Sequence, residues 1–260
     1  MKEYLNFAIN IAKHAGEKIK ENFYIDNNIE YKEDRTPVTL IDKQINEYLI
    51  EEVNRVYPDH SVDGEEAKKD GSNYVWVCDP IDGTSMFTRR VPVSVFSLAL
   101  VIDGIPTVAV VYDPFLDEMY TSIKGEGAYL NKKRIYVNDK KYGQIGSSID
   151  YCMWNNARYD TIELIKKLRD NFKICQIGST AHASMLVANG KISAEIFPGV
   201  EHGNCDIAAS ALIVEEAGGK VTNFKGEIQR YDRDIDGVIL SNGIIHDELI
   251  KLIKEIYERN

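Results

Sequence analysis

The strongest constraint on the fold of this chain is an apolar run, residues 75–78, that is followed directly by an aspartate. Such a run is typical of a buried strand. It places Asp79 at the end of that strand, where Pro80 is expected to take the chain out of the hydrogen-bonded ladder. Asp82 follows three residues later. Two carboxylates so close raise each other's pKa unless a cation lies between them, so the segment predicts a site for a hard divalent ion.

Gly83 and Thr84 add groups that suit an anion. If a short helix begins here, its free N–H groups point towards the cation, and helix N-termini bind phosphate. Gly83 lets the backbone approach a ligand closely, while Thr84 can orient a water or bond a phosphate oxygen. The alternative is an ordinary turn, because Asp-Pro and Asp-Gly are common turn formers and Thr84 could simply cap a helix.

The apolar pattern elsewhere divides the chain into a helical opening and a β-rich stretch. Residues 2–23 and about 39–55 have helical spacing, with Thr39 as the expected N-cap of the second helix and a loop at 32–39 between them. Four β-rich runs between residues 74 and 123 predict a meandering, largely antiparallel sheet.

The second half of the chain alternates strands and helices, as layered α/β structures do. After the apolar helix that ends near Gly218, one short strand and a C-terminal helix are expected. We therefore expect one domain over 1–260, with an α+β half to about residue 140 that carries the motif and an α/β half from about 141 that carries Asp206.

Composition excludes several classes of protein. The 260 residues are 44% hydrophobic and carry 41 acidic against 31 basic side chains, a net charge of −10 that argues against a nucleic-acid binder. The four cysteines form no CxxC pair, so zinc knuckles and redox pairs are not expected. The apolar residues near the N-terminus recur at helical spacing, and no run approaches a membrane span, so a cytoplasmic protein is expected.

Further acids accompany the motif, and together they resemble a known family. The segment GEE at 64–66, the segment WVCDPIDGTSMF at 76–87 and the segment CDIAASALIVEEAGG at 205–219 occur in the order and spacing of the inositol monophosphatase family. This family lies within the lithium-sensitive phosphatases. The resemblance spans nearly the whole chain and implies a five-layered αβαβα sandwich, a homodimer, and hydrolysis of phosphomonoesters with two or three Mg²⁺ ions. Mn²⁺ is a possible substitute, and Ca²⁺ and Li⁺ are expected inhibitors.

The resemblance also assigns roles to single residues. It implies that the first metal is held by Glu65, Asp79 and the Ile81 carbonyl, and the second by Asp79, Asp82 and Asp206, with Glu65 also reaching a third ion. Asp82, Gly83 and Thr84 are the implied phosphate contacts.

Asp42 matches the family aspartate that pairs with the motif threonine to activate the attacking water, so Asp42, Thr84 and Glu65 are the expected catalytic residues. Thr39 and Asp42 also have the spacing of a capping interaction, and both roles can hold at once. A metal-activated water would attack phosphorus without a covalent phosphoenzyme.

Substrate contacts are expected from Gly178, Ser179 and Thr180, although Ser179 or Thr180 could equally be a helix N-cap. Inositol phosphatases carry a substrate-binding glutamate before the last metal aspartate. Here one alignment places Phe197 at that position, while the longer segment that follows offers Glu201 or His202.

Two further departures, Met86 for the usual asparagine and Cys205 for the usual tryptophan, affect no expected metal ligand. The expected activity is Mg²⁺-dependent hydrolysis of a small polyol or sugar phosphate, with inositol 1-phosphate first. The alternatives are fructose 1,6-bisphosphate, histidinol phosphate and a 3′-phosphoadenosine nucleotide. A different class, a regulatory protein of the transcription machinery, also occurs in the family. Neither a membrane nor a nucleic acid is an expected direct partner.

Overall fold

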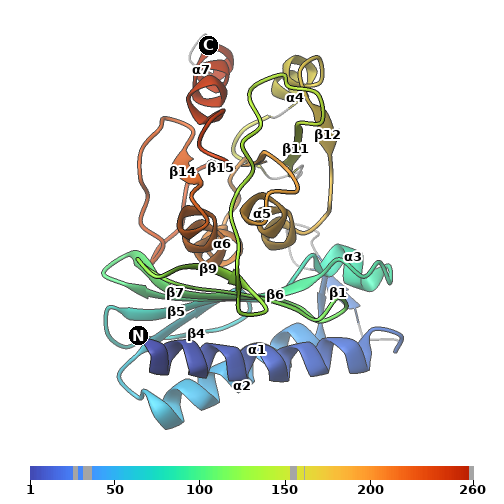
Figure 1. Cartoon of the computed structure of the whole chain (residues 1–260). Helices are drawn as coiled ribbons and strands as arrows, with labels where there is room; N and C mark the ends of the chain where they lie inside the picture. The colour runs from blue at the N-terminus through green and yellow to red at the C-terminus, as the bar shows by residue number, and fades with distance from the viewer. Residues whose placement is uncertain (26–28, 32–36, 153–156, 161, 258–260) are drawn as a thin grey trace.

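The computed structural model describes residues 1–25, 29–31, 37–152, 157–160 and 162–257. Its helices and sheets stack in alternating layers (Figure 1). The helices are α1 (Lys2–Asn22), α2 (Leu40–Val56), α3 (Thr84–Thr88), α4 (Ile162–Leu168), α5 (Thr180–Ala188), α6 (Asn204–Glu216) and α7 (His246–Tyr257). Within the described part of the chain, none of these helices combines the length and the apolar character that a membrane crossing requires.

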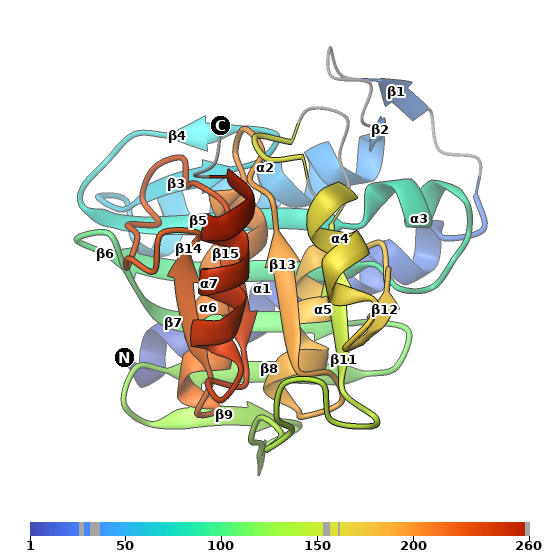
Figure 2. The ribbon, with the colours of Figure 1, turned by 90° about the horizontal axis from the view of Figure 1, so that it is seen from above.

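Five layers make up the molecule. The helices α1 and α2 cover one face of an eight-stranded sheet, and α5 and α6 cover its other face. A five-stranded sheet lies on the far side of α5 and α6, with α4 and α7 beyond it (Figure 1). Figure 2 shows the strands of the two sheets running crosswise to each other. The αβαβα sandwich expected from the sequence is confirmed.

The large sheet is the expected antiparallel meander. Its order is β10-β9-β8-β7-β6-β5-β3-β4, and among these pairs β3 and β5 run parallel. Asp103 and Gly104, both with positive φ, form the tight turn that joins β6 to β7. The strands are β3 (Ser61–Gly64), β4 (Lys68–Lys69), β5 (Tyr74–Asp82), β6 (Val95–Ile102), β7 (Ile105–Asp113), β8 (Glu118–Ile123), β9 (Gly127–Leu130) and β10 (Lys133–Arg134).

The expectation that Pro80 takes the chain out of the ladder at the end of β5 is wrong. β5 remains paired with β6 as far as Asp82: Asp79 lies opposite Ser97 and Asp82 opposite Val95. Residues 79–82 of β5 therefore lie opposite only residues 95–97 of β6. The extra residue makes a β-bulge, which tolerates Pro80 because a bulge leaves one residue out of the ladder. Side chains three residues apart on a regular strand point to opposite faces, so the extra residue allows both aspartates to face one site.

The smaller sheet has the order β12-β11-β13-β15-β14. β11 runs parallel to β12 and β13, whereas β15 is antiparallel to β13 and β14. Between α6 and α7 the chain forms two strands rather than the single short strand expected. The strands are β11 (Ser148–Tyr151), β12 (Lys173–Cys175), β13 (Ala194–Phe197), β14 (Lys220–Asn223) and β15 (Val238–Ser241).

The expected loop before α2 is partly a strand. β2 (Pro37–Thr39) pairs antiparallel with β1 (Ile29–Tyr31), and residues 32–36 lie outside the described part. The helices α1 and α2 begin and end within two residues of the sequence-based expectation, and Thr39 is the N-cap of α2. The two sheets draw their strands from before residue 140 and after residue 141 respectively.

Candidate metal centre and active site

Three carboxylates from distant parts of the chain meet beside the bulge of β5. Asp79 and Asp82 come from β5, and Asp206 comes from the first turn of α6. One carboxylate oxygen from each lies within 4.8 Å of the other two. Asp79 and Asp82 are buried, while Asp206 is partly exposed. The structure therefore brings together three of the acids that the sequence singled out.

Hydrogen bonds tie the start of α6 to β3. The Asn204 side-chain amide donates to the Asp63 carboxylate at 2.7 Å, and Lys68 pairs with the other oxygen of Asp63 at the same distance. Asn204 precedes Asp206 by two residues. The contact with Asp63 therefore fixes where α6 delivers Asp206 to the cluster.

Glu65 lies at the end of β3, next to β5. Its N–H donates to the Cys78 carbonyl at 3.0 Å, which continues the parallel pairing of β3 and β5. Its carboxylate is close enough to raise the pKa values of Asp79 and Asp82. Glu65 thus lies near Asp79 and Asp82, and its role as a metal ligand stays a prediction.

A buried asparagine of α2 holds the segment that carries Glu65. The Asn46 amide donates to the Ala67 carbonyl at 3.1 Å and accepts from the Glu66 N–H at 3.3 Å. A Cβ at position 64 would lie 2.1 Å from the Asn46 oxygen, so Gly64 is required for this approach. Asn46 did not emerge from the sequence. Its signal is a polar residue one helical turn after Asp42, on the inward-facing side of α2.

Burial and like charge dominate the electrostatics of the cluster. Burial, and then Glu65, Asp82 and Asp206, raise the pKa of Asp79 well above its usual range. Burial also raises the pKa of Asp82, against the opposing effect of three hydrogen bonds. Burial and like charge therefore penalise the ionised form of both carboxyls. A divalent cation would reduce that penalty, because it places positive charge next to the clustered carboxylates.

The N-terminus of α5 supplies the three hydrogen bonds to Asp82. The Ser179 hydroxyl and the Ala181 N–H, at 2.7 Å, donate to Oδ2, and the Thr180 N–H donates to Oδ1 at 3.2 Å. Ser179 is also the N-cap of α5, since it accepts from the His182 N–H at 3.3 Å. The alternative in which Ser179 is a cap is confirmed, and the same hydroxyl orients Asp82.

Two glycines allow α3 and α5 to begin side by side. Gly83 has φ +87°, and a Cβ there would lie 2.9 Å from the Ser179 Cβ. Gly178 has φ +88°, and a Cβ there would lie 2.6 Å from the end of the Met86 side chain. Met86 therefore packs directly on the turn that leads into α5. Both positions need glycine for backbone angle and for space.

Asp42 makes both the capping contact with Thr39 and the contact with Thr84 that the sequence predicted, while its catalytic role stays a prediction. Its Oδ2 accepts from the Thr39 N–H at 2.8 Å, as part of a capping box at the start of α2. Its Oδ1 accepts from the Thr84 hydroxyl at 3.2 Å, and the same hydroxyl lies 2.8 Å from the Ile81 carbonyl. Burial raises the pKa of Asp42 to about 7, against the hydrogen bonds from Thr39, with Glu65 adding to the rise.

The residues expected near the substrate differ in how far they are buried. Thr180 is buried, with its hydroxyl 3.3 Å from the Cys152 sulfur. Phe197 is fully buried and packs on Gly203, where a Cβ would lie 2.7 Å from the ring. Glu201 and His202 are exposed, and His202 has a left-handed backbone with φ 59°. A role in substrate binding for these residues remains a prediction.

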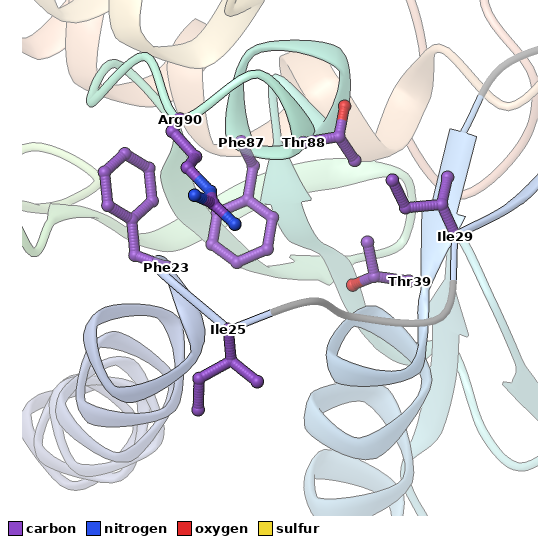
Figure 3. Close-up of a pocket in the computed structure, with 7 residues that line it drawn as sticks. All are labelled: Phe23, Ile25, Ile29, Thr39, Phe87, Thr88 and Arg90. Atoms are coloured by element: carbon purple, nitrogen blue, oxygen red, sulfur yellow. The ribbon is translucent and has the colours of Figure 1, made fainter.

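A separate pocket lies beside α3, between the end of α1 and the β1–β2 hairpin (Figure 3). Its walls combine apolar side chains with polar ones, and Figure 3 shows the Arg90 guanidinium lying near the rings of Phe23 and Phe87. The lining residues are Phe23, Ile25, Ile29, Thr39, Phe87, Thr88 and Arg90. None of the three clustered carboxylates lines this pocket.

The residues present fit a divalent metal. The cluster offers carboxylate oxygens from Asp79, Asp82 and Asp206, with Glu65 beside them, and hard cations such as Mg²⁺ prefer oxygen ligands. Two of these acids are buried next to each other, an arrangement that is unfavourable without a cation. The Ile81 carbonyl lies in the same bulge and bonds Thr84. An oxygen-ligated Mg²⁺ site is therefore consistent with the local chemistry.

The layered fold, together with an oxygen-rich cluster beside a threonine–aspartate pair, defines a phosphatase that hydrolyses phosphoric monoesters. The sequence profile described as the inositol monophosphatase family matches residues 1–258. The chain belongs to the inositol monophosphatase family.

Similar proteins cover almost the full chain. A "Fructose-1,6-bisphosphatase/inositol-1-monophosphatase" of Thermotoga maritima is 31% identical and covers 98% of this chain and 97% of its own length. A solved IMPase structure from the same organism is 29% identical, with a TM-score of 0.88 over 99% of both chains. A "Nus factor SuhB" of Pasteurella multocida is 33% identical over 87% of each chain.

Proposed function

We propose that this chain is a Mg²⁺-dependent phosphomonoesterase that acts on a small polyol or sugar phosphate, with inositol 1-phosphate the leading substrate. The observation that carries the proposal is the position of Thr84. It follows Asp82 by two residues, and its hydroxyl bonds both the Ile81 carbonyl and Asp42. Thr84 thus connects Asp42, a group able to accept a proton, to the short segment that carries the proposed metal ligands Asp79, Ile81 and Asp82.

The metal would be held by Glu65, Asp79, the Ile81 carbonyl, Asp82 and Asp206. When bound, Mg²⁺ supplies Lewis acidity that activates water and neutralises charge on the phosphoryl oxygens. Glu65, Asp82 and Asp206 all raise the pKa of Asp79, so Asp79 lies near each of the other three acids. A bridging role for Asp79 is consistent with that position.

Asp42 and Thr84 would orient the attacking water and carry its proton. The Thr84 hydroxyl donates its proton towards Asp42 and Ile81, so its lone pairs remain available to accept from a water. As the water attacks phosphorus, its proton moves to Thr84 while the Thr84 proton moves to Asp42 Oδ1. The P–O bond to the alcohol breaks in the same step, and the departing alcohol oxygen takes a proton from solvent. The pKa of about 7 suits Asp42 to accept a proton near neutral pH.

The phosphate would lie against the Gly83–Thr84 turn. Gly83 keeps its backbone free of a side chain at the point where the chain passes Ser179. Asp82, Gly83 and Thr84 are therefore the proposed phosphate contacts. The alcohol portion of the substrate is proposed to contact Gly178, Ser179, Thr180 and Glu201.

A phosphate-release screen tests the proposal. Purified protein is incubated with inositol 1-phosphate, fructose 1,6-bisphosphate, histidinol phosphate or a 3′-phosphoadenosine nucleotide, with Mg²⁺ or with EDTA, and with or without Li⁺. Release that requires Mg²⁺ supports the proposal, and the preferred compound identifies the substrate. Absence of release from all four would contradict it.

A second candidate function follows from the similarity to a Nus factor SuhB. We propose it as an alternative in which the chain regulates transcription by binding a protein partner. The presence of Asp42, Glu65, Asp79, Asp82, Thr84 and Asp206 favours the phosphatase, because a binding role alone does not require this set. An Asp82→Asn protein that retained a transcriptional effect in cells would support the alternative.

A further inference from the structure

Glu195 is a fully buried carboxylic acid on β13, next to the second turn of α5. Its Oε2 accepts from the Ser184 hydroxyl in the second turn, and its Oε1 accepts from the Cys152 thiol at 3.7 Å. The Cys152 sulfur lies 3.3 Å from the Thr180 hydroxyl in the first turn. One carboxyl group therefore contacts α5 directly at Ser184 and through Cys152 at Thr180.

Burying this carboxyl is unfavourable. Burial, with contributions from Asp150 and Asp82, raises the pKa of Glu195 well above its usual range. An apolar side chain would fill the same space without that penalty. Unlike an apolar side chain, a carboxyl accepts two directed hydrogen bonds here. One comes from Ser184 of α5, and the other comes from Cys152, which contacts Thr180 of α5.

The helix α5 is the element that holds Asp82. Its first turn contributes the Ser179 hydroxyl and the N–H groups of Thr180 and Ala181, all of which donate to the Asp82 carboxylate. Hydrogen bonds from outer residues fix the orientation of carboxylates that bind metal. A shift of α5 along β13 would move all three donors together.

We propose that Glu195 is a positioning residue for the metal centre: through Ser184, Cys152 and Thr180 it holds the start of α5 in the place from which α5 orients Asp82. This inference rests on the proposed function, because it takes Asp82 to be a metal ligand. Glu195 itself touches neither substrate nor metal. Its effect reaches the centre through α5.

A second metal site at this place is the competing interpretation. Ligand atoms of Asp150, Cys152 and Glu195 lie within 4.8 Å of one another. These acids already accept hydrogen bonds from protein donors: Asp150 from the Ile177 N–H at 2.9 Å, and Glu195 from Ser184 and Cys152. The cluster is therefore better described as a support for α5.

Three variants and one control test the inference in the full-length protein. Glu195→Leu removes both hydrogen bonds, Ser184→Ala removes the direct one, and Glu195→Gln keeps an acceptor for Ser184. The control is Ser193→Ala, which removes another fully buried hydroxyl of the same region, bonded to Ser147 at 2.9 Å and remote from α5 contacts with Asp82.

The readouts are the Mg²⁺ concentration that gives half of the maximal thermal stabilisation, and the Mg²⁺ concentration that gives half-maximal phosphate release. We expect Glu195→Leu and Ser184→Ala to raise both concentrations by about 10-fold, the size expected for lost outer-shell support. Glu195→Gln and Ser193→Ala should stay within about twofold of wild type. If Glu195→Leu does not fold, the Mg²⁺ dependence of Ser184→Ala tests the inference on its own.

Unchanged Mg²⁺ dependence in Ser184→Ala, or an equal shift in Ser193→Ala, would overturn the inference while leaving the proposed function intact. A wild-type protein that shows neither Mg²⁺ stabilisation nor Mg²⁺-dependent release would instead contradict the proposed function, and the inference with it. The two failures are distinguishable, because only the second one is seen in the wild-type protein.

Discussion

The hydroxyl of Thr84 lies 3.2 Å from Oδ1 of Asp42 and connects the turn after β5 to the first turn of α2. The same hydroxyl lies 2.8 Å from the Ile81 carbonyl, so one proton is shared between two acceptors. Asp42 is fixed from its other side by Thr39. Asp42 and Thr84 are therefore within hydrogen-bond reach of each other, which is the geometry that proton transfer requires.

Replacing Asp42 with asparagine should abolish most turnover without unfolding the protein. The introduced amide can accept from Thr39 and donate to Thr84, while the Thr84 hydroxyl turns to Ile81, so every hydrogen bond keeps a partner. We expect kcat to fall by about 100- to 10,000-fold, the usual range for loss of a general base. Steady-state kinetics at saturating Mg²⁺ measure the effect. A kcat within about fivefold of wild type would exclude Asp42 as the base.

The same substitution should change how the stability of the metal-free protein depends on pH. The pKa of Asp42 is about 7 in the folded chain and 3.8 in the unfolded reference, so the folded state binds more protons between these values. Stability is therefore lost as pH rises from about 4 to 7, by up to roughly 4 kcal/mol at pH 8. Thermal melts in EDTA should show Asp42→Asn to be more stable than wild type at pH 8 and similar at pH 4. A lower melting temperature for the variant at pH 8 would contradict the burial argument.

Thr84 offers a matched pair of substitutions. Thr84→Ser keeps the hydroxyl and should retain activity within about 10-fold. Thr84→Val keeps the shape but removes the proton relay, and should lower kcat by about 100-fold or more. Thermal stabilisation by Mg²⁺ should persist in both variants, since the side chain of Thr84 is not an expected metal ligand. Equal kcat values for the serine and valine variants would argue against the relay.

Ser179 should affect metal affinity more than turnover. Ser179→Ala removes one of three donors to Asp82, and loss of such an outer hydrogen bond typically weakens metal binding by about 10- to 100-fold. Ser122→Ala is the control, because Ser122 is equally buried but donates to Gly127 in the β8–β9 hairpin. Titrations of activity with Mg²⁺ should be shifted for the first variant and unchanged for the second.

Glu201 tests where substrate choice lies. Glu201 is exposed, whereas Phe197, at the other aligned position, is enclosed in the core. If Glu201 bonds substrate hydroxyls, Glu201→Gln should raise KM for the preferred substrate by about 5- to 10-fold, as expected for one lost charge-assisted hydrogen bond. The Mg²⁺ dependence should remain unchanged. An unaltered KM across the whole substrate panel would remove Glu201 from the substrate site.

The parts of the fold and site that could be predicted are those that depend on residues close together in the sequence. The helices α1 and α2, the cap at Thr39 and the acids of the 79–84 motif follow from spacing and residue type. The bulge at Pro80 could not be predicted, because it depends on how β5 pairs with β6. A proline in an apolar run signals a break, and only the paired strand shows that the ladder continues beyond it.

Long-range support of the site was also invisible in the sequence. Asn46, Asp63 with Asn204, and Glu195 hold the elements that carry Glu65, Asp206 and α5, and each acts on a residue far away in the chain. A single buried polar residue carries no signal of its partner. The partners of such residues can be identified only from the three-dimensional structure, where the layers pack together.

The most direct test compares Asp82→Asn with Asp113→Asn at saturating Mg²⁺. Both aspartates are buried near the end of a strand of the large sheet, but Asp113 lies outside the acidic cluster and bonds the turn at Phe115 and Leu116. Its other oxygen lies 3.7 Å from His182 of α5, and asparagine keeps the same shape at that contact. The measurement is phosphate release from the preferred substrate, together with thermal stabilisation by Mg²⁺. We predict that Asp82→Asn loses more than about 100-fold of activity and most of the Mg²⁺ stabilisation, while Asp113→Asn keeps both. Near wild-type release by folded Asp82→Asn would contradict the assignment of this cluster as the catalytic metal centre.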